Sequence, residues 1–149
     1  MQVNQGDDFG WPYCYYSIES KAKVLAPEYG GDGKQVGRCA KAKDAVIPFP
    51  AHWAPLAIAF YPSDAFGTKY KNGLFVAFHG SWNRAPLPQA GYRVVFAPFS
   101  DGKATGEYET FATGRAATDL RASGVAAGTD GSLYISADRN GKIWKVMKR

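Results

Sequence analysis

An uncharged apolar run, Leu74 to Phe78, constrains the fold of this chain more than any other stretch. The turn dipeptide Asn72-Gly73 precedes it, and a second, largely apolar run over residues 92–99 follows after a Pro-rich interruption. A strand that is apolar on both faces must be covered on both sides, so the two runs predict buried strands between stacked sheets. Sandwiches and propellers stack their sheets in this way.

The rest of the chain also favours an all-β fold. Aromatic residues make up 15% of it, and 17 Gly and 9 Pro supply frequent turns, a combination typical of all-β proteins. Asp130-Gly131 and Asn140-Gly141 are strong hairpin signals between apolar runs. Further strands are predicted over residues 56–61, 107–111, 123–127, 133–136 and 142–146.

Two parts of the chain resemble each other, and repeated meanders of about four strands are typical of propeller blades. The matching segments are residues 55–59 with 123–127, residues 73–77 with 132–136, and residues 92–95 with 143–146. We therefore predict one partial β-propeller domain over residues 1–149, built from antiparallel four-stranded meanders. Its parts are a short strand and a long loop over residues 1–53, one blade over residues 54–114, and a second, shorter blade over residues 115–149.

Two cysteines, Cys14 and Cys39, lie in the polar, Gly-rich N-terminal segment. We predict a disulfide between them, because a long loop without structure of its own needs a covalent or functional constraint. The alternative is two unrelated thiols. A zinc site is disfavoured, because two Cys without a nearby His pair do not complete its ligand shell. A disulfide would place the protein in an oxidising compartment.

The formal net charge of +5 allows two interpretations, a solvated basic surface or a basic pocket for an acidic cofactor. Nucleic-acid binding is not expected, because no basic run is interleaved with stacking aromatic residues in a known motif. No apolar stretch approaches the ~20 residues that span a bilayer. The N-terminal residues do not have the pattern of a signal peptide.

Several motifs, taken together, resemble the C-terminal part of the glucose/sorbosone dehydrogenase family, in its L-sorbosone dehydrogenase-like branch. Members are six-bladed β-propellers that bind pyrroloquinoline quinone (PQQ) and Ca²⁺, and this chain would hold about two of the six blades. The motifs are Asp8 to Cys14, His52 with Ala54-Pro55-Leu56, Phe78 to Arg84, Gly91 to Phe96, and Asp130 to Tyr134.

The resemblance implies part of a PQQ-dependent sugar or aldose dehydrogenase that oxidises C1 by hydride transfer to the quinone. The family's general-base His, its Arg-Asn pair near the quinone and its Ca²⁺ ligands precede the matched segment. They are therefore expected outside this chain, which alone is expected to be inactive and to hold no metal. The alternative is a non-catalytic propeller module that binds sugar or protein.

Four residues are the candidates for binding the quinone. Arg84 and Arg121 suit its carboxylates, because a guanidinium pairs with a carboxylate through two parallel donors. His79 follows a buried strand and is also a possible catalytic residue; the alternative is a histidine that anchors a loop. Trp82 is a candidate wall for the substrate cleft. Asp130 and Asp138 lie in turns, where bonds from the side chain to the backbone explain them.

The expected partners are a sugar substrate and whatever closes the propeller ring. Exposed faces on the first and last sheets predict association with the remaining blades or self-association. The oxidising compartment that the predicted disulfide indicates makes a periplasmic or secreted protein the expectation. The substrate, the electron acceptor and the assembly are not determined by the sequence.

Overall fold

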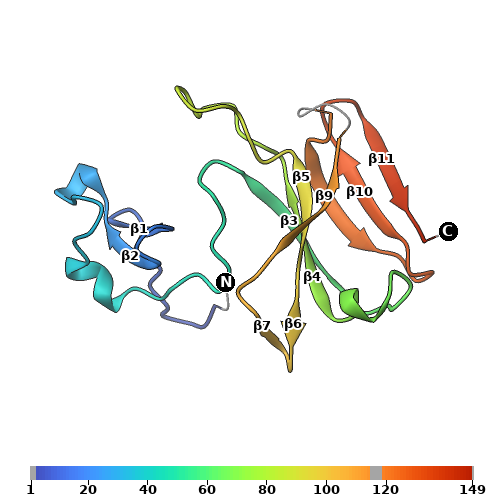
Figure 1. The fold of residues 1–149 in the computed structure, drawn as a ribbon, viewed down its shortest axis with the longest axis horizontal. Coiled ribbons are helices and arrows are strands. Elements are labelled where there is room, and N and C mark those ends of the chain that lie inside the picture. Colours follow the sequence, from blue (N-terminus) through green and yellow to red (C-terminus); the bar gives the residue numbers. More distant parts are fainter. Residues whose placement is uncertain (1–2, 115–118, 149) are drawn as a thin grey trace. The chain divides into compact units, whose positions relative to one another are not determined.

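Antiparallel strands form the regular structure of this chain, which is a computed structural model that describes residues 3–114 and 119–148 (Figure 1). The chain divides into two compact units, residues 1–50 and residues 51–149. Helical structure in the described residues is limited to three short 3₁₀ turns, Pro27–Tyr29, Gly37–Lys41 and Thr68–Tyr70. None of the helices there is long enough or apolar enough to cross a membrane.

The first unit contains a β-hairpin that a disulfide links to a 3₁₀ turn. Strands β1 (Cys14–Ser17) and β2 (Ala22–Leu25) pair in antiparallel register. A disulfide joins Cys14 to Cys39 in the turn Gly37–Lys41, which confirms the predicted bond. Val24 and Cys39 are buried, so the disulfide lies in the small core of this unit.

The short strand predicted for residues 1–53 was expected at their start, within residues 1–9, and is absent from the described residues 3–9. Carboxylates organise this segment into turns instead. Asp7 accepts a hydrogen bond of 2.8 Å from the backbone N–H of Asn4, and Asp8 accepts one of 2.7 Å from that of Gly10. Such local bonds compete with strand pairing for the backbone donors.

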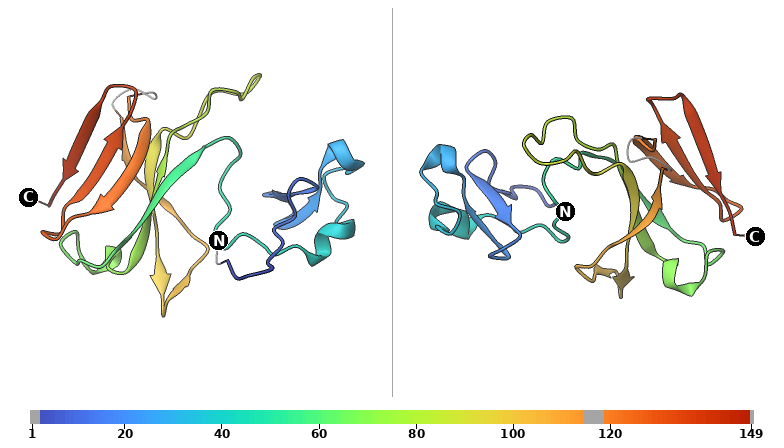
Figure 2. Two further views of the ribbon diagram at one scale, coloured as in Figure 1. Left: turned by 180° about the vertical axis from the view of Figure 1, so that it is seen from behind. Right: turned by 45° about the horizontal axis from the view of Figure 1, so that its top comes forward.

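The second unit holds two main sheets and a small hairpin (Figures 1 and 2). The four-stranded sheet has the order β3 (Pro55–Tyr61), β4 (Gly73–Phe78), β5 (Arg93–Ala97) and β8 (Glu109–Thr113). The three-stranded sheet has the order β11 (Lys142–Val146), β10 (Leu133–Ala137) and β9 (Ala122–Ala127). The hairpin consists of β6 (Phe99–Ser100) and β7 (Lys103–Ala104).

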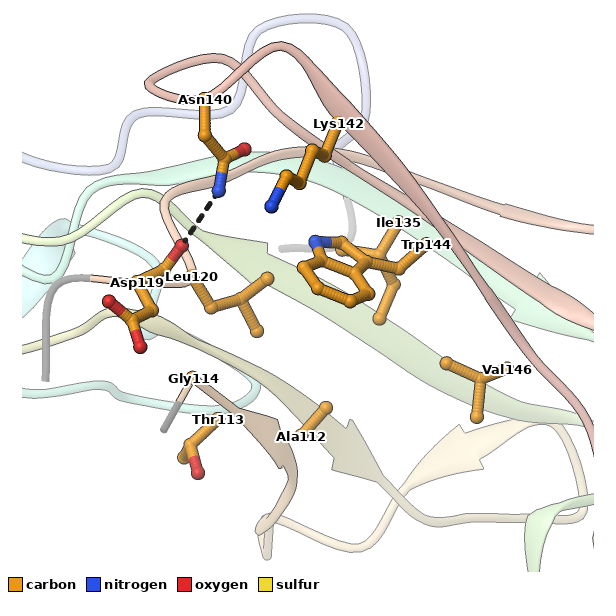
Figure 3. A pocket seen from close by; sticks show the side chains of 10 residues that line it. All are labelled: Ala112, Thr113, Gly114, Asp119, Leu120, Ile135, Asn140, Lys142, Trp144 and Val146. Atoms are coloured by element: carbon orange, nitrogen blue, oxygen red, sulfur yellow. Dashed lines mark hydrogen bonds between the residues drawn. The ribbon is translucent and has the colours of Figure 1, made fainter. Parts of the chain in front are cut away.

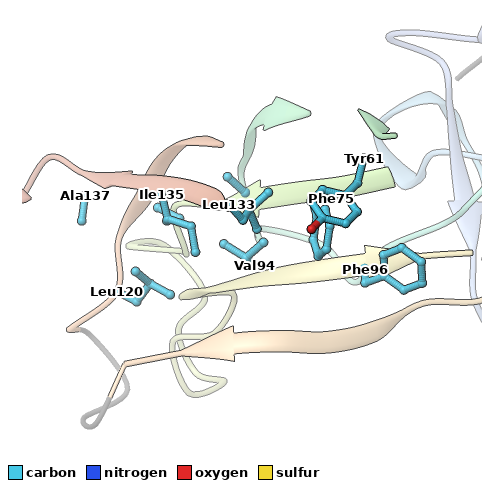
Figure 4. Close-up of a cluster of buried hydrophobic side chains, with 10 residues drawn as sticks. Tyr61, Phe75, Val94, Phe96, Leu120, Leu133, Ile135 and Ala137 are labelled. Atoms are coloured by element: carbon cyan, nitrogen blue, oxygen red, sulfur yellow. The ribbon is translucent and has the colours of Figure 1, made fainter. Parts of the chain in front are cut away.

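The two main sheets pack face to face through a shared apolar core (Figure 4). Phe75 of β4 is fully buried, and its ring meets those of Phe96 and Phe111 with centroids 5.3 and 4.7 Å apart. Leu133 and Ile135 of β10 belong to the same cluster. The predicted fold class, all-β with stacked propeller blades, is confirmed.

A buried hydroxyl fixes one sheet to the other. Tyr61, at the end of β3, is fully buried and donates a hydrogen bond to the backbone carbonyl of Gly131, in the turn before β10. A bond between segments so distant in the sequence aligns the two sheets as well as holding them together.

The turn before β10 carries an ion pair that makes stability depend on pH. Lys145 Nζ lies 2.8 Å from the Asp130 carboxylate, and the backbone N–H and hydroxyl of Ser132 each donate to it at 3.0 Å. These bonds, the one from Lys145 first, lower the pKa of Asp130 to about 2. A depressed pKa means that the stabilisation is complete above the ordinary value of 3.8 and is lost as the pH falls toward 2.

We therefore expect unfolding in urea to become easier between pH 4 and pH 2, and Asp130→Asn to remove part of that dependence. Intrinsic tryptophan fluorescence at a series of pH values measures it. Asp101→Asn, in the β6–β7 turn, is the control and should leave the dependence in place. An identical pH profile for wild type and Asp130→Asn would contradict the assignment.

Candidate functional site

A hollow of about 430 Å³ lies where several strands of the second unit begin or end, lined by His79, Arg121, Asp138 and Arg139. His79 directly follows β4, Arg121 directly precedes β9, and Asp138 with Arg139 directly follows β10. Because β9 and β10 are antiparallel, the start of one lies beside the end of the other. The sheets thus bring these side chains to one rim, where a rigid scaffold commonly carries its site.

His79 is held between a carboxylate and a guanidinium. Its Nε2 lies 3.0 Å from both carboxylate oxygens of Asp138, and its Nδ1 lies 3.5 Å from Nη1 of Arg121. Arginine has only donors, so Nδ1 is the acceptor and Nε2–H donates to Asp138. The bond from His79 is the main cause of a lowered Asp138 pKa, which keeps that carboxylate ionised.

Arg121 has donors that the protein uses weakly. Besides the contact with His79, its Nη2 lies 3.5 Å from the Tyr92 hydroxyl, and its guanidinium carbon lies 5.2 Å from the centroid of the Tyr92 ring. Its Nε is buried and has no hydrogen-bond partner among the described residues. A buried donor without an acceptor is rare in folded proteins. The guanidinium therefore suits an anionic acceptor brought into the hollow.

Tyr92 is the support behind Arg121. It is 7% exposed, and its hydroxyl donates to the backbone carbonyl of Ser81 at 2.5 Å. Gly80 passes so close to this ring that an added Cβ would lie 2.1 Å from Cδ1 of Tyr92. Gly80 also has φ of +90°, which other residues rarely adopt. Position 80 therefore requires glycine, because any other residue would clash with the Tyr92 ring and would have to adopt an unfavourable φ.

Two of the candidate residues, Trp82 and Arg84, lie on the loop between β4 and β5 and are not among the residues that line this hollow. The loop is closed by Ser81, whose backbone N–H donates to the carbonyl of Ala90 at 2.8 Å. Arg84 donates to the carbonyl of Pro88 at 2.8 Å, within the same loop. Trp82 is 82% exposed. The structure thus brings His79 and Arg121 together and places Trp82 and Arg84 on the neighbouring loop.

Sequence reasoning missed Asp138 and Arg139 as members of the site. Asp138 was explained by its turn, yet its carboxylate bonds His79. The internal repeat could have identified Asp138. Residues 73–77 match residues 132–136, and continuing this alignment places His79 opposite Asp138. The two blades therefore contribute equivalent positions to one hollow.

The donor set of the hollow fits part of a PQQ molecule. Two guanidinium groups face it together with one carboxylate that is already bonded to His79, so free donors remain for carboxylates of the cofactor. Among the described residues there is no group of three or more His, Cys, Asp or Glu that could hold a metal ion. The two guanidinium groups, from Arg121 and Arg139, make the hollow a candidate anion site.

The amino-acid sequence matches one family model and is similar to two further proteins. The model of a family described as TrAA12-like matches residues 1–149. An uncharacterized protein of Borreliella burgdorferi is 31% identical over 145 residues, which cover 94% of this chain and 36% of that protein. A pyrroloquinoline quinone-dependent pyranose dehydrogenase of Coprinopsis cinerea is 31% identical over 172 residues, covering 94% of this chain and 22% of that enzyme.

A solved structure supports the fold. The Trichoderma reesei carbohydrate-active enzyme of family AA12 superposes with a TM-score of 0.72 at 24% identity, covering 96% of this chain and 39% of that one. The chain thus spans well under half of the relatives that it matches.

Proposed function

The chain belongs to the TrAA12-like family, and on that premise we propose that it supplies the C-terminal part of a PQQ-dependent dehydrogenase acting on a pyranose or related aldose. The Coprinopsis relative, named for this cofactor and substrate class, supports the proposal. The bound quinone would supply the hydride acceptor for oxidation at C1 of the sugar. The general base and the Ca²⁺ ligands would come from polypeptide outside this chain.

The observation that carries the proposal is Arg121 at an open hollow, with a buried Nε that has no hydrogen-bond partner in the part of the chain that the structure describes. In the proposed site Arg121 and Arg139 bind carboxylates of the quinone. Asp138 holds His79, which in turn positions Arg121 through the contact at Nδ1. Because Nε2–H already donates to Asp138 and Nδ1 already accepts from Arg121, both ring nitrogens of His79 are engaged, so we assign His79 to cofactor positioning rather than to base catalysis.

We expect Arg121→Ala to weaken PQQ binding by about 10- to 100-fold, because a hydrogen bond to a charged group contributes ~1.5–3 kcal/mol. Titration of the 149-residue chain with PQQ, followed by quenching of tryptophan fluorescence, measures the affinity. Lys103→Ala removes one exposed positive charge in β7 and is the charge-matched control, which should bind as the wild type does.

Arg84→Ala tests the loop separately. Because Arg84 donates to its own loop, we expect a smaller loss of affinity than for Arg121→Ala. If the wild-type chain shows no saturable PQQ binding but does bind sugars, the non-catalytic module is the better description. Dye reduction with aldoses, PQQ and Ca²⁺ then tests the full-length protein.

A further inference from the structure

Two asparagines of this chain, Asn72 and Asn140, are followed by glycine. Asparagine before glycine is chemically labile, because glycine has no side chain to keep its backbone nitrogen away from the asparagine amide. One dipeptide comes at the start of β4 and the other directly before β11, and their surroundings differ. That difference determines which asparagine can react while the protein is folded.

Asn140 and Gly141 lie in the exposed turn between β10 and β11, outside the last strand pair. Gly141 has φ of +60°, and an added Cβ there would find no atom within 4 Å beyond its chain neighbours. Its N–H donates to the carbonyl of Asp138 at 3.3 Å, which is longer than the usual range for such bonds. Nδ2 of Asn140 lies 3.5 Å from the backbone carbonyl of Asp119 (Figure 3). Both reacting groups can therefore move without breaking a strand pair.

Asn72 and Gly73 are held more tightly. The N–H of Asn72 donates to the carbonyl of Tyr61 at 2.7 Å, and Gly73 pairs with Tyr61 as the first residue of β4. Gly73 is buried, and an added Cβ there would lie 2.2 Å from Cε2 of Phe96. The peptide group between residues 72 and 73 can therefore rotate toward the Asn72 side chain only when this end of β4 leaves the sheet.

We propose that Asn140 is a site of spontaneous deamidation in the folded protein. The backbone nitrogen of Gly141 attacks Cγ of Asn140, so that an N–Cγ bond forms, a succinimide ring closes and the Cγ–Nδ2 bond breaks. The side-chain amide nitrogen leaves as ammonia and takes the proton of the Gly141 N–H. Water then opens the ring at either carbonyl and leaves aspartate or isoaspartate at position 140. The net reaction consumes water, changes no oxidation state and replaces a neutral amide with a carboxylate.

The turn that would change also carries two residues of the hollow. Asp138 and Arg139 directly precede Asn140; the carbonyl of Asp138 accepts the Gly141 N–H, and its carboxylate bonds His79. Isoaspartate adds a carbon to the backbone after residue 140 and so lengthens the turn, and either product adds a negative charge next to Arg139. If the hollow binds PQQ, as the proposed function requires, the modified protein should bind it more weakly.

Peptide mapping by mass spectrometry tests the modification without any ligand. The intact chain is incubated at mildly alkaline pH, which favours the deprotonated backbone nitrogen, and the two Asn-Gly peptides are followed with time. We expect conversion at Asn140 to be at least about tenfold faster than at Asn72, because Asn72 reacts only during local opening of β4. In guanidinium chloride, where no sheet protects Asn72, the two rates should become similar.

Two variants identify the reacting groups. Asn140→Gln should stay unmodified over the same time, because glutamine would have to close a larger and less favourable ring. Gly141→Ala keeps the asparagine but places a methyl group beside the attacking nitrogen, in space that is open in the structure, and should slow the conversion. On ion exchange, the incubated wild type should gain a form with one positive charge less, and incubated Asn140→Gln should not.

Titration with PQQ before and after incubation measures the consequence for the hollow. The affinity of the wild type should fall by about threefold or more, the effect of weakening one hydrogen bond to a charged group, whereas that of Asn140→Gln should not change. An unchanged wild-type affinity after complete conversion would overturn the link to the hollow. Absence of PQQ binding before incubation would contradict the proposed function instead, and the mapping would still decide the deamidation.

Two mapping results would overturn the proposal itself. The first is conversion in the folded chain that is as fast at Asn72 as at Asn140. The second is a difference between the two rates that persists in guanidinium chloride, which would mean that the neighbouring sequence, rather than the fold, selects the reacting asparagine.

Discussion

Replacing Phe75 with alanine is expected to lower the free energy of unfolding of residues 51–149 by about 3–5 kcal/mol. The ring is fully buried at the centre of the aromatic cluster, with the Tyr61 and Phe96 centroids 5.4 and 5.3 Å away. Its loss would leave a cavity between the two sheets, because Tyr61 and Leu133 are held by their own strands. Since a domain is commonly stable by only ~5–15 kcal/mol, the effect is a large share of the total.

Urea unfolding followed by tryptophan fluorescence measures the Phe75→Ala effect. Phe60→Ala is the control, because Phe60 is 57% exposed in β3 and its loss should cost less than about 1 kcal/mol. Phe75→Leu keeps most of the volume and provides a measurable variant if Phe75→Ala does not fold. Equal effects at positions 75 and 60 would contradict the assignment of Phe75 to the core.

Opening the Cys14–Cys39 disulfide is expected to be the second large effect, about 3–4 kcal/mol in the chain-entropy model for a bond with a sequence separation of 25. The first unit has few other sources of stability. Its buried apolar residues are Val24, Ala26 and Cys39 itself. We therefore expect the β1–β2 hairpin to open while the second unit stays folded.

Cys14→Ala combined with Cys39→Ala tests this expectation, with amide exchange as the readout. Exchange at β1 and β2 should accelerate by two orders of magnitude or more, as about 3 kcal/mol implies. Exchange at β9 and β10 serves as the internal control and should not change. Reductant added to the wild-type chain should give the same pattern, and an unchanged hairpin in both experiments would show that the disulfide is not what holds it.

The strands of the second unit could be predicted because their signals are local. Apolar runs bounded by Asn72-Gly73 and Asp130-Gly131 mark their own ends. The β1–β2 hairpin gave no such signal. Its turn runs through Lys21, which has φ of +50° without being a glycine or asparagine, so the sequence carries no turn dipeptide there. The disulfide, in contrast, was found because the chain has just two cysteines.

The sequence identified individual residues of the candidate site but not their arrangement. His79 could be identified because it follows a buried strand, and Arg121 because the resemblance to the family places a cofactor-binding arginine before the corresponding strand. Their meeting with Asp138 depends on how two sheets are stacked, which no local pattern encodes. Arg84 was predicted to bind the quinone because it is a basic residue in a motif typical of the family. In the structure its guanidinium instead donates to the carbonyl of Pro88 in its own loop.

A substitution at Gly80 would disturb the hollow indirectly, through the Tyr92 ring. It does not line the hollow, yet the space for a Cβ is already filled by the Tyr92 ring, and that ring backs the Arg121 guanidinium. Any bulkier residue would push on the ring and, through it, on the cation. Attempts to retune the preference of this protein for its ligand can therefore vary Arg139 at the open rim, whereas position 80 has to be left as it is.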